Sequence, residues 1–208
     1  KLISDLFLDN NSVQEFNLTH GYRAQTHLGS MLMYHGIIEA ARNIARGTDV
    51  QPQERELESF ISKLENAGAN ARVFIFGSIF GGTGASSIPV IPKALQDFVK
   101  IRSGGTSSID FTKAKFGSTL LTEYFTFKKP DDKQKSAKED SVIADSSFFP
   151  LNSQAALQFY QSDPTVQKCY KILYHIGWPI ESKKVDEENS GHKTITGGAN
   201  QKNPCHIT

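Results

Sequence analysis

The fold is constrained most by a short apolar run that leads directly into a glycine-rich segment and then into a helix-forming segment. Residues 72–76 (Arg-Val-Phe-Ile-Phe) are typical of a strand that is buried on both faces of a sheet. Glycines are concentrated in residues 77–84, and apolar residues then recur at helical spacing from residue 91 to about residue 100. A strand, a glycine loop and a helix in this order are typical of α/β proteins.

The rest of the chain continues this alternation. Apolar residues recur every three or four positions in 30–46, 52–66 and 152–160, which predicts three further helices. Residues 118–127 and 171–176 are dense in apolar and aromatic side chains, which predicts two more strands. We therefore expect an α/β fold with a mostly parallel sheet and helices on both faces. Ligands of such sheets bind at the carboxyl ends of the strands, where the glycine loop lies.

Length and composition predict one domain. The 208 residues are enough for a single substantial core, and 38% hydrophobic with 22% charged residues is ordinary for a soluble globular protein. Residues 128–150 include a charged, proline-containing run and are predicted to form an exposed insertion. The polar, Gly/Asn-rich residues 181–208 are predicted to form a long loop. Because both ends stop in sequence that looks interrupted, we expect residues 1–208 to be an incomplete domain of a larger protein.

Charge and cysteine usage exclude several classes of partner. The formal net charge is +1, so no general field attracts nucleic acid or an anionic membrane, and no apolar stretch approaches the roughly 20 residues that cross a bilayer. Cys169 and Cys205 have no CxxC spacing, which argues against a zinc site and a disulfide framework. The histidines are not spaced as metal ligands. We expect a cytoplasmic protein with no nucleic-acid partner, no membrane partner and no protein-held metal.

The glycine loop has the chemistry of a phosphate site. Phosphate is held best by several backbone N–H groups that converge at the start of a helix, where the helix dipole favours negative charge. Glycines let the backbone approach the ligand, and Thr83 and Ser86 add hydroxyl groups. The alternative is a tight turn that needs glycine for geometry alone. Neither a P-loop Lys-Ser/Thr pair, a GxGxxG with its acidic partner, nor a GxSxG nucleophile elbow is present at this loop.

Residues 74–91 read Phe-Ile-Phe-Gly-Ser-Ile-Phe-Gly-Gly-Thr-Gly-Ala-Ser-Ser-Ile-Pro-Val-Ile. This run resembles the signature of the tubulin/FtsZ family, which is a hydrophobic strand, a GGGTGSG-like loop and a helix with an early Pro-Val-Ile. Phe80 stands in place of the first glycine of the triplet, and Ala85-Ser86 in place of the closing Ser/Thr-Gly. The chain therefore resembles a divergent prokaryotic, bacterial tubulin-like protein. The resemblance extends with decreasing specificity over residues 20–208.

The resemblance implies a Rossmann-like domain that binds GTP or GDP, with Mg²⁺ held through the nucleotide. It also implies a cytoskeletal protein that polymerises into homo-oligomers or filaments, and a GTPase whose hydrolytic residues lie on a second domain outside this chain. The residues that it assigns to the nucleotide are Gly77, Ser78, Gly81, Gly82, Thr83, Gly84, Ala85 and Ser86 at the phosphates, Arg23, Thr26 and Gly29 at the terminal phosphate, and Asn203 at the base.

Several alternatives stay open at this stage. Residues 21–30 also suit an ordinary capping turn with Ser30 as the N-cap of the next helix. Asn203 precedes a proline and suits a simple turn. At the level of function, the alternatives are a non-assembling tubulin-like interaction or regulatory module, and an enzyme of another kind that uses the glycine loop for a phosphorylated cofactor.

Overall fold

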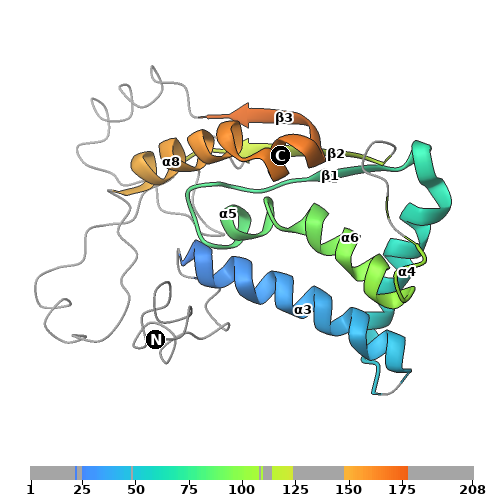
Figure 1. Ribbon diagram of the computed structural model, residues 1–208. Helices are drawn as coiled ribbons and strands as arrows, with labels where there is room; N and C mark the ends of the chain where they lie inside the picture. The colour runs from blue at the N-terminus through green and yellow to red at the C-terminus, as the bar shows by residue number, and fades with distance from the viewer. Residues whose placement is uncertain are drawn as a thin grey trace, which may run out of the picture.

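The computed structural model describes residues 22, 25–47, 49–107, 109, 114–123 and 148–177. Within this part, three parallel strands form one sheet in the order β1-β2-β3 (Figure 1). The strands are β1 (Arg72–Ile75), β2 (Lys115–Leu121) and β3 (Tyr170–Ile176). The helices are α3 (Thr26–Arg46), α4 (Pro52–Ala67), the 3-10 turn η2 (Gly68–Asn70), α5 (Thr83–Ser87), α6 (Ile91–Arg102), α8 (Phe149–Ser162) and α9 (Pro164–Cys169). The predicted α/β class with a parallel sheet is confirmed.

The hydrophobic core lies between one face of the sheet and the helices. Because the strands follow one another in sequence order, right-handed crossovers place their connecting helices on the same face. Phe116 and Leu120 of β2 are buried against Phe98 and Val99 of α6, and the same cluster includes Tyr160 of α8. The helix α3 packs on the outside of α5 and α6 (Figure 1). This arrangement brings the beginnings of α3, α5 and α8 to one region of the molecule.

The opposite face of the sheet is aromatic and exposed in the described part of the chain. Its side chains are between 41% and 79% exposed and are Phe74, Phe76, Ile172, Tyr174 and Ile176. The ring of Phe74 lies 4.9 Å from that of Phe76 and 6.0 Å from that of Tyr174. It covers Gly117, where an added Cβ would come within 2.8 Å of the ring. Of the two helix layers that the sequence predicts, the described residues show one.

The helix limits follow local capping signals in part. The predicted stop at Gly47 is confirmed, because this residue is left-handed (φ 70°) and its N–H donates to the carbonyls of Asn43 and Ile44. The prediction for 52–66 matches α4, where Glu54 accepts from the N–H of Gln51 at 2.8 Å. The helix α3 begins four residues before the predicted start, so Ser30 lies inside the helix and is not its N-cap.

The helix predicted from residue 91 to about residue 100 matches α6, and the short helix α5 precedes it. The break falls at residues 88–90, where Pro89 cannot donate a backbone hydrogen bond, while Pro92 is tolerated near the start of α6. The strand β2 begins three residues before its predicted start, and α8 includes residues 149–150 of the predicted insertion. The short helix α9, which the sequence analysis did not predict, is capped by Asp163, whose carboxylate accepts from the N–H of Val166 at 2.9 Å. Residues 124–147 and 178–208 lie outside the described residues.

Gly36 within α3 and Gly47, which caps its end, test this description of the helix. Gly36→Ala adds a methyl group into open space in the helix interior, and we expect it to raise the free energy of unfolding by about 0.5–1 kcal/mol. Gly47→Ala forces a side chain into the left-handed region, and we expect it to lower the free energy of unfolding by about 1 kcal/mol. Urea unfolding measures both values, and equal signs for the two changes would contradict the assigned end of α3.

Candidate functional site

The glycine loop lies at the carboxyl end of β1 and is tied to the end of β2. The N–H of Leu121 donates to the carbonyl of Gly77 at 3.1 Å, and the N–H of Ile79 donates to the carbonyl of Leu121 at 2.9 Å. Ser78 therefore pairs with Leu121 as an isolated parallel bridge beyond the last residue of β1. The loop is in this way fixed to the edge of the sheet at which α/β proteins bind ligands.

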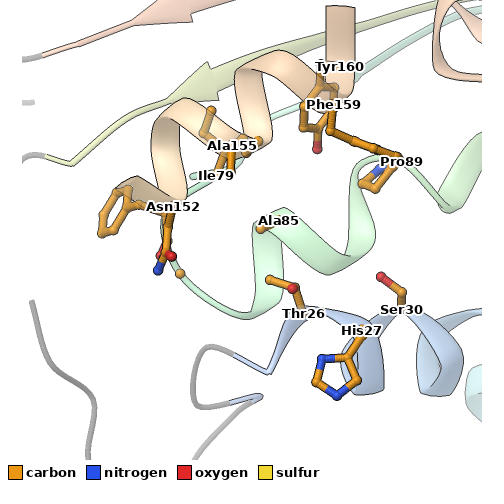
Figure 2. Close-up of a pocket in the computed structure, with 13 residues that line it drawn as sticks. Thr26, His27, Ser30, Ile79, Ala85, Pro89, Asn152, Ala155, Phe159 and Tyr160 are labelled. Carbon is orange, nitrogen blue, oxygen red and sulfur yellow. The ribbon is translucent and has the colours of Figure 1, made fainter. Parts of the chain in front are cut away.

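A cavity of about 360 Å³ opens beside this loop (Figure 2). Its walls come from the loop and α5, from the first turn of α3, and from one face of α8. The lining residues with polar side chains are Thr26, His27, Ser30, Asn152 and Tyr160, and Gly81 adds backbone without a side chain. The volume falls in the range of roughly 300–1,000 Å³ that is usual for small-molecule sites.

The first turns of α3 and α8 contribute residues to the cavity wall, and the glycine loop on the wall leads into α5. None of these three helices has an acidic residue in its first turn, and no side chain caps any of them. The first N–H groups of a helix lack partners within the helix, and the helix dipole adds positive potential there. Glu123 accepts a hydrogen bond from Ser153 of α8 at 2.7 Å but does not line the cavity. The local electrostatics of the walls therefore favour an anion.

The glycines of the loop have different physical roles. An added Cβ at Gly84 would lie 2.1 Å from the carbonyl oxygen of Ser78, so glycine is required there for α5 to pack on the loop. At Gly81 the nearest atom would be the Ser78 Oγ at 3.9 Å, and the backbone is not left-handed. Packing of the described chain does not require a glycine at position 81, and Gly81 lines the cavity. Its missing side chain leaves room at the wall for a ligand.

Two predicted phosphate residues have packing roles between α3 and α5. The side chain of Ser86 is fully buried, and its hydroxyl donates to the carbonyl of Thr83 at 2.9 Å. The hydroxyl of Ser30 donates to the carbonyl of Ser86 at 2.9 Å. A Cβ at Gly29 would come within 2.8 Å of the Ser86 Oγ. The Ser86 hydroxyl thus makes a hydrogen bond within α5, and Gly29 lets α3 approach α5.

The other predicted residues that the structure describes either line the cavity or hold the loop in place. Thr26, Gly81 and Ala85 line the cavity, and Gly82 and Thr83 form the start of α5. Gly77 holds the loop to β2, because its N–H donates to the Thr119 hydroxyl at 3.1 Å. A Cβ at this position would come within 2.9 Å of Ile88. Ser78 belongs to the same support through its pairing with Leu121. Arg23 and Asn203 lie outside the described residues.

The sequence analysis did not identify the contribution of α8 to the cavity. The residues of α8 on the wall are Asn152, Ala155, Ala156, Phe159 and Tyr160, which follow the i, i+3, i+4, i+7, i+8 spacing of one helix face. That spacing is visible in the sequence. The spacing predicts that this helix face packs against another segment. It does not identify that segment, because the loop is about 70 residues away in sequence.

The comparisons with known proteins identify no family for this chain. No protein-family model, curated protein or solved structure matches this chain. In the described residues, no three His, Cys, Asp or Glu side chains gather into a group that could hold a metal ion. None of the helices in the described ranges combines the length and the apolar character needed to cross a bilayer.

The two glycines of the loop should respond differently to alanine. We expect Gly84→Ala to lower the free energy of unfolding by about 1–3 kcal/mol, because its methyl group overlaps the Ser78 backbone. We expect Gly81→Ala to remain within about 0.5 kcal/mol of the parent, because it meets open space. Thermal and urea unfolding of the two variants test the assignment. A Gly81→Ala variant as unstable as Gly84→Ala would mean that the Gly81 wall is closed by protein.

Proposed function

We propose that this chain binds a nucleotide, with the phosphates against Gly81 and the first turns of α3 and α5. The observation that supports this proposal best is that the open glycine wall at Gly81 lies in one cavity with the first turn of α3, a long helix that has neither a side-chain cap nor an acidic residue at its start. The resemblance of residues 74–91 to the tubulin/FtsZ signature makes GTP the proposed nucleotide, with GDP as its product and Mg²⁺ held through the phosphates.

The residues that would hold the phosphates are few and uncharged. Gly81 offers a close approach to backbone, Thr26 and Thr83 offer hydroxyl groups, and Asn152 offers an amide at the start of α8. No lysine or arginine side chain is among the described residues that line the cavity. Backbone dipoles and hydroxyl groups therefore supply the recognition that we propose.

A side chain at Gly81 tests the phosphate wall directly. Gly81→Val should weaken GTP binding by about 10- to 150-fold, which corresponds to the roughly 1.5–3 kcal/mol of a hydrogen bond to a charged group. The matched control is Gly36→Val, a change at an exposed glycine of α3 that does not line the cavity. Isothermal titration calorimetry with GTP measures both. GTP binding by Gly81→Val at the affinity of the parent, in a folded protein, would remove the loop from the proposed site.

The resemblance carries the proposal further, to GTP-dependent self-assembly and to hydrolysis that is completed between subunits. In the family, carboxylates from a second domain of the neighbouring subunit position the attacking water. Such positioning contributes a large share of catalysis. The non-assembling tubulin-like module and the enzyme with another phosphorylated cofactor are the alternatives that an experiment must separate from this one.

We expect this chain to hydrolyse GTP negligibly at low protein concentration, since the resemblance implies that carboxylates of a neighbouring subunit complete the site. We expect the rate of phosphate release per molecule to rise with protein concentration, together with light scattering by larger particles. A dilution series of the protein measures both. Robust turnover that does not depend on protein concentration would place the catalytic groups within one chain and exclude the shared site.

A further inference from the structure

The first turn of α3 carries the one described wall residue whose side chain can become positively charged. Because His27 lines the cavity and is exposed, a ligand in the cavity can reach its side chain. Figure 2 shows this residue between Thr26 and Ser30 at the beginning of the helix. Histidine is the residue type that usually gains its positive charge near neutral pH. The charge of the cavity wall therefore depends on pH.

A histidine at this position conflicts with the usual charge preference of a helix. The first turn of a helix has positive potential, so acidic residues are stabilising there and a protonated histidine is not. The first turn of α3 contains no acidic residue and the helix has no side-chain cap, so nothing in that turn offsets a positive charge on His27. Departures from local preference of this kind are expected at functional sites. A bound anion would provide the negative charge that the turn itself does not.

No acidic side chain is among the described residues that line the cavity with His27. The glycine loop and α5 have no ionisable side chain. The other titratable groups around this turn are the phenols of Tyr22 and Tyr160. On α6, the Asp97 carboxylate accepts a hydrogen bond from Tyr34 at 2.8 Å and is paired with Lys93. Because Tyr34 lies seven residues after His27, about 10 Å along the helix axis, the partner of a protonated His27 has to come from the cavity.

We infer that the protonated His27 imidazole contacts the phosphates of the nucleotide, so that binding takes up a proton and weakens as the pH rises. The inference rests on the proposed function and deepens it, because it adds a side chain that makes the affinity depend on pH. Its place agrees with the resemblance, which assigns the neighbouring Thr26 and Gly29 to the terminal phosphate. An imidazolium donates charge-assisted hydrogen bonds from both ring nitrogens, whereas the neutral ring has one donor and no charge. The protonated form therefore binds phosphate more tightly.

The variant His27→Gln keeps a polar side chain that has no charge. We expect GTP to bind the parent about 10-fold more tightly than the variant at about pH 6, and less than about 2-fold more tightly at about pH 8. Comparing the two proteins at each pH removes the titration of the nucleotide itself. Inorganic tripolyphosphate should show the same pattern, because the proposed contact is with phosphate. The control is His35→Gln, which changes an exposed histidine of the same helix that does not line the cavity.

Isothermal titration calorimetry in two buffers with different ionisation enthalpies measures the protons that are taken up on binding. We expect more uptake near neutral pH by the parent and by His35→Gln than by His27→Gln. We also expect His27→Gln without ligand to unfold at or above the temperature of the parent at about pH 6, because a positive charge near a helix N-terminus is unfavourable. The two measurements together separate a contact with the ligand from a structural role of the side chain.

The contrary outcomes can be told apart. The same pH dependence of GTP binding in His27→Gln and the parent would overturn the inference and leave the proposed function intact. A pH-dependent loss with GTP but none with tripolyphosphate would overturn it as well, because the imidazole would then act on another part of the nucleotide. A parent protein that binds neither GTP nor tripolyphosphate would overturn the proposed function itself.

Discussion

Gly84 brings the first turn of α5 so close to the backbone of Ser78 that no side chain fits between them. The position of the whole loop depends on this contact, because Ser78 is itself held by the end of β2 through the bonds of Gly77 and Ile79 to Leu121. With α5 fixed in this way, its outer side meets α3 through the bond from Ser30 to Ser86. The cavity lies beside this assembly, so backbone contacts set the position of its loop wall.

Sequence reasoning could reach the sheet and the loop because their signals are local. The apolar run 72–76 and the glycines that follow are adjacent in the chain, so strand and loop could be predicted together. The start of α3 could not be predicted from local signals, because Gly29 and Ser30 have the composition of a helix boundary. Their reason for being inside the helix is tertiary: Gly29 allows contact with Ser86, and Ser30 bonds to it, across 56 residues of sequence. Packing overrides local propensity at that point.

For the candidate site, too, local features could be predicted from the sequence, and contacts between distant segments could not. A glycine-rich run identifies a possible phosphate loop, but it does not tell which glycine faces a ligand and which faces the protein. That distinction needs the neighbours of Gly81 and Gly84 in space. Asn152 and Tyr160 were outside the predicted site for a related reason, since a helix face gives no sign of which distant segment it meets. The alternation of strands and helices predicted helices on both faces of the sheet. Whether a helix covers a face depends on which segments meet in space, and one face is exposed in the described residues.

A ligand in the cavity would couple elements that come from distant parts of the chain. The contacts between α8 and the loop include the Phe80 and Phe149 rings, 4.9 Å apart, and the long bond from Asn152 to the Phe80 carbonyl. A ligand that contacts Gly81, Thr26 and Asn152, which all line the cavity, would bridge α8 to α3 and the loop. Because binding to the folded state stabilises it by about 2.7 kcal/mol at a ligand concentration of 100 Kd, such a bridge would make the packing of α8 depend on the occupancy of the cavity.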